Sequence, residues 1–319
     1  MNTIKTNLGR VEANVLDRHA NGAASLITLS RPYLLDTPYG TLIPQYLPWE
    51  DGRRYESVIS LYANGNVKFM TLQHQTPVDT PAGAIKAEGL FFHEDGTLKR
   101  VFPRYGKLSG YWTEANEYAL AEALPVRLPD GETLTVKLLG LAFYPSGKLR
   151  SLTLWPQERG TIRTPVGRAS VRIGVSYYES GKLRSFEPAE PLAVETPIGR
   201  LKAHDPMPTG INGDVNSLLF AEDGAVTSLT TAEHGIEVSF AWGETRIFEP
   251  DTRPGLCSDL VRDPVPLRLG FHAGYVIICT REIYTFDLKN NRFKVLDHHP
   301  SPGVRTDRLN WMAAEDGCC

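Results

Sequence analysis

The chain has 319 residues, of which 41% are hydrophobic and 22% are charged, and its formal net charge is −3. This composition is typical of a globular protein and excludes extensive disorder except at the ends. The slight acidic excess excludes the basic surface that neutralises phosphates, so we expect no nucleic-acid partner. All-β and repeat folds reach this length as one body, so one or two domains are expected.

The N-terminal residues lack the features of a targeting segment. Residues 1–7 contain no apolar core of a signal peptide, and no window of the sequence approaches 18 uninterrupted apolar residues. We therefore expect a cytoplasmic protein without a membrane partner. The cysteines, Cys257, Cys279, Cys318 and Cys319, lack metal-ligand spacing and the density of a disulfide-stapled domain. Reduced thiols and a frayed Cys318–Cys319 tail are expected.

Five turn glycines divide the middle of the chain into repeats. They are Gly65, Gly96, Gly147, Gly181 and Gly224. Apolar residues stand six and four positions before each glycine and two and five positions after it, as do Ile59, Leu61, Val67 and Met70 around Gly65. A spacing of two places side chains on one face of an extended chain, whereas a helix needs spacings of three and four. The pattern predicts hairpins closed by three-residue turns, each with its glycine at positive φ.

A second family of turns alternates with the first and has the sequence Thr-Pro-x-Gly. Its members are Thr37–Gly40, Thr80–Gly83, Thr164–Gly167 and Thr196–Gly199, with Leu128–Gly131 as a looser copy. Proline presets φ ahead of the glycine, so these segments also predict tight turns. Three more glycines fall inside predicted strands, seven residues before a turn glycine: Gly89, Gly140 and Gly174. A strand glycine of this kind is typical of a bulge, a bend or a close backbone approach.

The pattern predicts an all-β fold, in which repeated antiparallel β-hairpins form an extended β-meander or a solenoid-like sheet. We expect an N-terminal segment at 1–25, a hairpin-repeat domain at 26–242, an irregular proline-rich connection at 243–270, C-terminal strands packing on the repeats at 271–297 and a flexible tail at 298–319. Residues 113–123 contain good helix formers and predict one short inserted helix. Segments 275–280, 283–288 and 292–296 predict three strands near the C-terminus.

Two segments resemble a known repeat family. Phe143–Ser151 and Tyr177–Ser185 each contain two aromatics, a polar turn, Gly-Lys-Leu and a polar residue, and in this they resemble the bacterial variant of the MORN repeat. The resemblance implies an open antiparallel β-meander that serves as a scaffold or a protein-interaction surface, and some bacterial members are labelled antitoxin-like. Residues 275–296 look instead like one blade of a β-propeller, and four strands per unit of about 40 residues suit that alternative.

Motifs of common enzyme classes are absent from the sequence: there is no Gly-x-Ser-x-Gly elbow, Walker loop, dinucleotide fingerprint or His-Glu-x-x-His helix. We therefore expect no cofactor and no metal. Weaker candidates remain. His204–Asp205 follows the fourth Thr-Pro turn and His234–Gly235 follows the fifth repeat, where either histidine could orient a proton-transfer group.

Two other candidates are a cysteine segment and a pair of histidines. Cys257–Asp259 lies in the proline-rich connection, with His272 as the nearest histidine in sequence. A cysteine nucleophile needs a base at hydrogen-bond distance, and an inert thiol is the simpler interpretation. The adjacent His298 and His299 would face opposite sides of a strand, which disfavours a metal site.

Charged residues recur in register with the turns. Asp36, Asp79 and Glu195 share one column, and a carbohydrate-acting enzyme needs two carboxylates close together. Basic residues follow the turn glycines at Lys148, Arg150, Arg168, Lys182, Arg184 and Arg200, and such a column could bind an acidic partner. A solvated sheet face is the simpler interpretation of both columns.

These observations favour a non-enzymatic repeat protein that acts as a scaffold or binds another protein. The alternative is a hydrolase or lyase that acts on carbohydrate, with carboxylates on one sheet face. The sequence identifies no catalytic residue and neither the partner nor the oligomeric state.

Overall fold

A computed structural model describes residues 2–48, 58–105, 114–208, 213–255, 262–299 and 304. The chain forms two compact units: unit 1 comprises residues 1–155 and 179–181, and unit 2 comprises residues 156–178 and 182–319. Nearly all elements are strands, and the one helix of the described residues is α1 (Glu114–Leu120), inside the segment predicted to be helical. The prediction of an all-β fold is confirmed.

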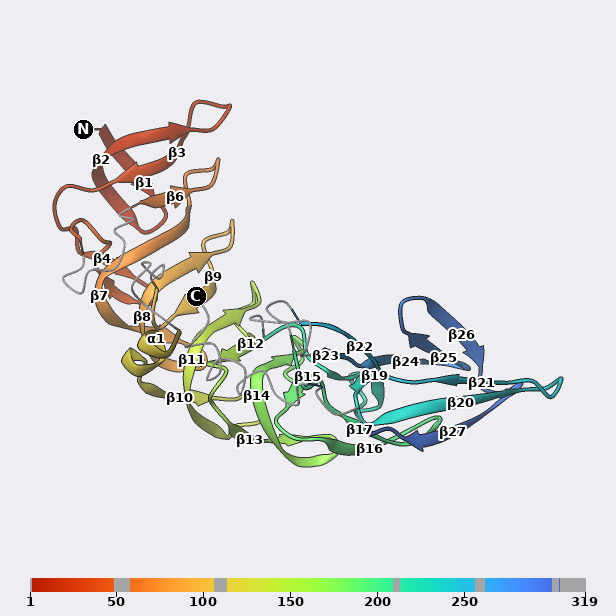
Figure 1. Cartoon of the computed structure of the whole chain (residues 1–319). Helices are drawn as coiled ribbons and strands as arrows, with labels where there is room; N and C mark the ends of the chain where they lie inside the picture. Colours follow the sequence, from red (N-terminus) through yellow and green to blue (C-terminus); the bar gives the residue numbers. More distant parts are fainter. Residues whose placement is uncertain are drawn as a thin grey trace. The chain divides into compact units, whose positions relative to one another are not determined.

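Unit 1 is an antiparallel meander. Its strands are β1 (Asn2–Thr6), β2 (Gly9–Arg18), β3 (Ala24–Thr28), β4 (Leu35–Thr37), β5 (Gly40–Leu42), β6 (Ile59–Leu61), β7 (Val67–Thr80), β8 (Gly83–Phe92), β9 (Leu98–Phe102), β10 (Ala123–Arg127), β11 (Thr133–Phe143) and β12 (Leu149–Leu154). They pair in the order β1, β2, β3, β6, β7, β8, β9, β11 and β12, while β10 pairs with β11 and β4 with β5. Figure 1 shows the tight turns of β2–β3, β6–β7 and β8–β9 on one side of this meander.

Unit 2 continues the same architecture. Its strands are β13 (Gly160–Thr164), β14 (Gly167–Tyr177), β15 (Leu183–Pro188), β16 (Leu192–Thr196), β17 (Gly199–Ala203), β18 (Leu218–Phe220), β19 (Val226–Thr231), β20 (His234–Phe240), β21 (Thr245–Phe248), β22 (Asp251–Pro254), β23 (Arg262–Val265), β24 (Leu267–His272), β25 (Tyr275–Cys279), β26 (Ile283–Asp287) and β27 (Asn291–Asp297). The main meander pairs β13, β14, β15, β18, β19, β24, β25 and β26 in that order. Smaller sheets are β16–β17, β21–β20–β27 and β22–β23.

The pairings distinguish between the two predicted architectures. Each hairpin of a meander pairs with the next one, whereas propeller blades are separate four-stranded sheets. The strands of each unit run from one hairpin into the next, and β25 and β26 belong to the meander of unit 2 rather than to a blade of their own. The structure is therefore the meander, and the propeller alternative is wrong.

The turn glycines have the predicted conformation. All five have φ between 83° and 91°. At the first, Tyr62 N–H donates to Asn66 O (2.8 Å) and Gly65 N–H donates to Tyr62 O (2.9 Å), which closes a three-residue turn. Gly22, with φ of 81°, ends the same kind of turn between β2 and β3. The hairpin pattern therefore already begins within residues 1–25.

The apolar columns form the core. Phe92, Phe143 and Phe220 stand four residues before a turn glycine, Phe186 stands five residues after one, and all four are among the largest fully buried side chains. Burying an aromatic side chain of this size contributes about 1.5–3 kcal/mol. The repeated columns therefore supply much of the stability of each meander.

In the Thr-Pro turns the threonine, as well as the proline, fixes the geometry. Thr80 Oγ1 donates to Gly83 O (2.7 Å) and accepts the N–H of Ala82 (3.1 Å). The same pair of bonds closes the Thr-Pro turns that begin at Thr37, Thr164 and Thr196. It also closes the turn Thr6–Gly9 between β1 and β2, which has no proline. A hydroxyl that bonds its own turn in this way stabilises the turn locally.

A side-chain hydrogen bond connects successive hairpins. The residue three positions before one turn glycine donates to the carbonyl four positions before the next turn glycine. In unit 1, His19 Nε2 donates to Leu61 O (3.0 Å), Tyr62 OH to Phe92 O (2.9 Å) and His93 Nε2 to Phe143 O (3.1 Å). In unit 2, Tyr178 OH donates to Phe220 O (2.7 Å). In the hairpin that follows, Ala221 occupies the donor position and has no side-chain donor, so this series of bonds ends there.

The strand glycines permit close approaches, as predicted. A Cβ atom added at Gly89 would lie 2.9 Å from the ring of Tyr105, and one at Gly140 would lie 3.3 Å from the ring of Phe102. At Gly174 the added Cβ would lie 2.6 Å from Asn216 Oδ1. Such contacts are shorter than van der Waals distances, so these strands need glycine to pack against the residues that cover them.

Residues 243–270 are more regular than we expected. They contain β21, β22, β23 and the first part of β24, and Thr252 pairs with Pro264 in the β22–β23 ladder. Among the described residues, β22 pairs with β23 alone, and β23 forms in addition the isolated bridge from Arg262 to Val304. Strands at an edge of this kind tolerate a proline that lacks an N–H. The three strands predicted near the C-terminus are confirmed as β25, β26 and β27. No helix of the described residues is long and apolar enough to cross a membrane.

Replacing Tyr178 by phenylalanine tests the bond between hairpins. The substitution removes the hydroxyl that donates to Phe220 O and keeps the ring, which carries Arg184 at 5.8 Å from its centroid. We expect Tyr178→Phe to lower the free energy of unfolding by about 1 kcal/mol, because a buried carbonyl loses its donor. Tyr275→Phe, at an exposed tyrosine of the same unit, is the matched control in urea denaturation. Equal stability of the two variants would contradict the assigned role.

Replacing Gly89 by alanine tests the close approach. Because the new Cβ atom would meet the Tyr105 ring at 2.9 Å, we expect Gly89→Ala to destabilise the protein by about 1–3 kcal/mol. The control is Gly270→Ala in β24, where the nearest atom is 3.6 Å from the added Cβ. Thermal denaturation followed by circular dichroism compares the two, and an equal effect of both substitutions would refute the steric explanation.

Candidate functional site

Segments of unit 2 that are distant in sequence meet beyond the end of β17. His204 and Asp205 follow β17 directly, and His204 N–H donates to Thr230 O in β19 (2.8 Å). Glu233 lies in the turn between β19 and β20, and its backbone oxygen accepts the N–H of His298 (2.8 Å). Two of the histidines noted in the sequence, His204 and His298, are thereby brought together.

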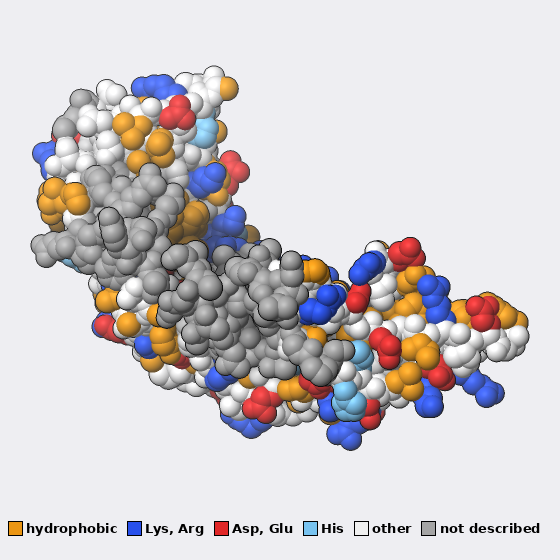
Figure 2. All heavy atoms as spheres, viewed as in Figure 1, with side chains coloured by type: hydrophobic (Ala, Val, Ile, Leu, Met, Phe, Trp, Pro, Cys, Tyr) orange, Lys and Arg blue, Asp and Glu red, His pale blue; other side chains and the backbone are white. Residues whose placement is uncertain are grey.

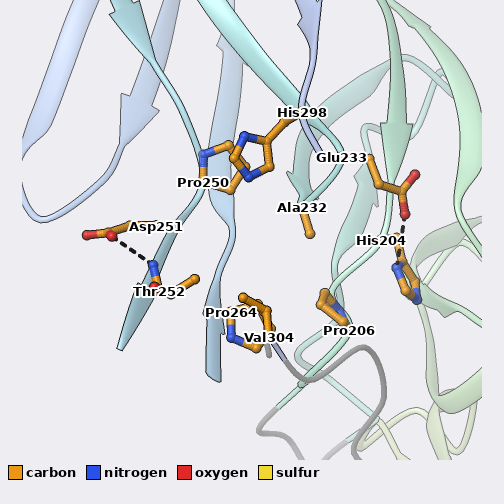
Figure 3. A pocket seen from close by; sticks show the side chains of 10 residues that line it. All are labelled: His204, Pro206, Ala232, Glu233, Pro250, Asp251, Thr252, Pro264, His298 and Val304. Atoms are coloured by element: carbon orange, nitrogen blue, oxygen red, sulfur yellow. Dashed lines mark hydrogen bonds and ion pairs between the residues drawn. The ribbon is translucent and has the colours of Figure 1, made fainter. Parts of the chain in front are cut away.

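These segments line a cleft of about 100 Å³. The lining residues are His204, Pro206, Ala232, Glu233, Pro250, Asp251, Thr252, Pro264, His298 and Val304. Figure 3 shows His204 and Glu233 on one wall and Asp251, Thr252 and Pro264, from β22 and β23, on the opposite wall. Half of the lining residues are apolar, so the cleft combines hydrophobic walls with a few titratable groups.

The imidazole of His204 contacts a charged group at each ring nitrogen. Its Nε2 lies 3.3 Å from Arg172 Nη2, and its Nδ1 lies 3.7 Å from Glu233 Oε1. A guanidinium only donates, so Nε2 is the acceptor and the proton of the neutral ring is on Nδ1, facing the carboxylate. Arg172 Nη2 also donates to Asp205 O. His204 therefore links a carboxylate at the cleft to a buried guanidinium in β14.

Arg172 faces a second carboxyl group behind the cleft wall. Arg172 and Glu187 are cross-strand partners in the β14–β15 ladder, and their residues are only 3% and 1% exposed. Glu187 Oε2 accepts both the N–H (2.8 Å) and the hydroxyl (2.6 Å) of Ser217. Its Oε1 has no hydrogen-bond partner among the described residues. Glu187 thus anchors the chain ahead of β18.

Burial shifts the protonation of the carboxyl groups in this region. Desolvation raises the pKa of Glu187 from 4.5 to about 7, against the lowering effect of its bond from Ser217. Desolvation also raises the pKa of Asp205 above its ordinary value, and that of Glu233 as well. Arg172 and Arg268 oppose the shift at Asp205, and Lys202 opposes the shift at Glu233. In this region, burial therefore destabilises the charged form of these carboxyl groups.

His234 lies close by in sequence but does not line the cleft. Its Nδ1 accepts the N–H of Lys202 (3.1 Å), and its Nε2 lies 3.5 Å from Asp297 Oδ1. Desolvation lowers the pKa of His234 below its ordinary value. Both ring nitrogens thus connect β20 to neighbouring strands, which is a structural role.

The remaining sequence candidates are not assembled into a site by the described residues. The ring of His272 stacks on Tyr275 at 4.8 Å, and His299 is exposed. Cys257–Asp259, Cys318 and Cys319 lie outside the described residues, and Cys279 is a free thiol. No group of three or more His, Cys, Asp or Glu side chains in the described part of the chain could hold a metal ion.

The two charged columns are solvent-exposed or locally paired. Asp36, Asp79 and Glu195 are all exposed, and Glu195 lies 3.7 Å from Arg200. In the basic column, Arg150 and Arg184 lie over the rings of Tyr144 and Tyr178. Lys148, Lys182, Arg168 and Arg200 are exposed. These contacts agree with the interpretation of both columns as solvated faces.

Arg172, Glu187 and Glu233 were not identified from the sequence. Glu187 follows Phe186 of an apolar column, so an alternating strand would place it on the solvent side. The structure covers that second face with the chain around Ser217, and Glu187 is buried there. A comparison of the chain with models of protein families found no match, and neither did a search of curated proteins.

The raised pKa of Glu187 predicts a stability that depends on pH. Between about 4.5 and 7 the unfolded chain releases the proton that the folded state retains, so stability falls as pH rises through this window. At about 1.4 kcal/mol per pKa unit, the decrease in the free energy of unfolding reaches about 3 kcal/mol by pH 8. Glu187→Gln retains an acceptor for Ser217 and does not titrate, so we expect a flatter profile and higher stability at pH 8.

Chemical denaturation at pH 5, 6, 7 and 8 measures this dependence. Glu190→Gln, at an exposed glutamate three residues further on, is the matched control and should follow the wild-type profile. A Glu187→Gln profile parallel to that of the wild type would show that Glu187 does not titrate in this window.

Proposed function

We propose that the protein is a non-enzymatic repeat protein, a scaffold or protein-interaction module, and that the cleft of unit 2 receives one side chain of a partner protein. The observation that carries the proposal is the environment of His204. Its Nε2 accepts from Arg172 and its Nδ1 faces Glu233, so the histidine of the cleft is not available as a base. What the cleft offers is apolar contact.

The size of the cleft supports the same assignment. Pockets for small-molecule ligands usually measure about 300–1,000 Å³. The cleft has about 100 Å³, which suits a single side chain. Binding energy at protein interfaces is concentrated in a few side chains that fill well-packed pockets. Walls of proline, alanine and valine suit an aliphatic anchor of this kind.

The hairpin architecture supports an interaction role in both units. The meander of repeated hairpins matches what the resemblance to bacterial MORN-variant repeats implies, and such a sheet presents a broad surface for a partner. We also propose a cytoplasmic location. Figure 2 shows acidic, basic and apolar side chains intermixed over the C-terminal strands, so this face of unit 2 does not carry charge of a single sign.

The carbohydrate-acting alternative requires two carboxyl groups that reach a substrate. Glu187 and Asp205 are two of the three carboxyl groups in the described part of unit 2 whose pKa values are raised, Glu233 being the third, and the charge of Asp205 contributes to the shift at Glu187. Glu187 is only 1% exposed and its Oε2 is bonded to Ser217. This burial favours a structural role for the pair, so the binding proposal is preferred.

Filling the cleft tests the proposed function. Ala232 lines the cleft, and Ala232→Leu places three more carbon atoms in it. We expect the variant to fold like the wild type and to retain about tenfold less of a co-purifying partner in quantitative affinity capture, because an anchor side chain contributes at least about 1.4 kcal/mol.

Ala63→Leu, at an exposed turn of unit 1, is the matched control and should retain the partner. Equal capture by Ala232→Leu and the wild type would overturn the assignment of the cleft. Turnover of a glycan that is abolished by Glu187→Gln would replace it with the carbohydrate-acting alternative.

A further inference from the structure

A larger hollow adjoins the cleft in unit 2. It has a volume of about 400 Å³ and is lined by residues 249–251, 265–267, 280–282 and 284. Pro250 and Asp251 line both the hollow and the cleft, so the two share the chain at the start of β22. Val265, Pro266 and Leu267 give the hollow an apolar surface.

The charges that line the hollow are not balanced. Three carboxylates, Glu249, Asp251 and Glu282, face one cation, Arg281, which leaves a formal charge of −2. Arg281 is already paired, because its Nη2 lies 2.9 Å from Asp251 Oδ2. In the described residues, Glu249 and Glu282 have no cationic partner within 4.0 Å. The hollow therefore lacks two positive charges.

Glu282 is held in place by Tyr284, whose hydroxyl donates to Glu282 Oε2 (2.5 Å). Arg246 Nη2 in turn donates to the hydroxyl oxygen of Tyr284 (2.8 Å) and lies over the tyrosine ring. Arg246 thus orients the tyrosine without pairing with the carboxylate. An ordered carboxylate loses less conformational entropy when a ligand binds.

We propose that this hollow binds a basic segment of a partner protein, with a lysine or arginine between Glu249 and Glu282 and its aliphatic stem on Pro250 and Val265. Long basic side chains bury their methylene groups on apolar surface and keep their charge at a polar rim, which matches this lining. Because the cleft adjoins the hollow, an extended segment can place an apolar side chain in the cleft and a basic one here. The inference rests on the proposed interaction role and specifies the chemistry of the partner.

A peptide titration tests the inference on the full chain. The probe is an alternating lysine–leucine pentapeptide, blocked at both ends, and its counterpart with acetylated lysines is the uncharged control. We expect saturable NMR shifts at the backbone amides of Glu249, Asp251, Thr252, Val265, Leu267 and residues 280–284 with the basic peptide, and no saturation with the acetylated one. Glu249→Gln combined with Glu282→Gln should raise the Kd about fivefold or more, since two partly exposed ion pairs are lost.

The matched control is Glu237→Gln combined with Glu244→Gln, two glutamates of the neighbouring β20–β21 hairpin that do not line the hollow, and it should leave the Kd unchanged. Unchanged affinity in the Glu249/Glu282 variant, or shifts spread over acidic residues elsewhere, would overturn the inference. Loss of partner capture by Ala232→Leu with peptide binding insensitive to Glu249 and Glu282 would leave the proposed function standing and refute the basic segment alone.

Discussion

The hydrogen bond from one hairpin to the carbonyl of the next is the interaction on which the meander depends. An isolated two-stranded hairpin is at best marginally stable in water, so each repeat needs its neighbour. His19, Tyr62 and His93 in unit 1, and Tyr178 in unit 2, occupy the same position in their turns and donate to equivalent carbonyls. The donor is part of the turn, so the geometry of each turn also sets the position of the following hairpin.

The turn chemistry and the burial pattern could be predicted from the sequence. Glycine at positive φ and apolar residues two positions apart are local signals, and the structure confirms both at Gly65 and in the column that contains Phe92. The bond between hairpins was not predicted, because histidine, tyrosine and alanine share its position and no single residue type marks it. The strands of residues 243–270 were missed because prolines usually indicate irregular chain, whereas here they lie in a two-stranded sheet.

The candidate site was predictable only in part. His204 and Asp205 were noted because they adjoin a turn, and the structure places His204 in a cleft with His298. Arg172 and Glu187 could not be recognised, since their importance comes from burial on the second face of the sheet and from pairing across strands. Glu233 could not be recognised either, because it lies in a turn and meets His204 from a distant part of the sequence. Alternation along a strand predicts which side chains point away from the apolar core. It does not predict which segment of the chain covers the opposite face of the sheet. The strands and turns could therefore be predicted from the sequence, whereas the contacts among the charged side chains of the site could not.

The tautomers of His19 and His93 test the central claim most directly. A carbonyl only accepts, so each histidine that connects two hairpins must carry its proton on Nε2. Long-range ¹H–¹⁵N NMR spectra of the chain labelled at histidine distinguish the two neutral tautomers at pH 8. The account predicts a single Nε2–H tautomer at both residues, and an Nδ1–H tautomer or an even mixture at either one would contradict it.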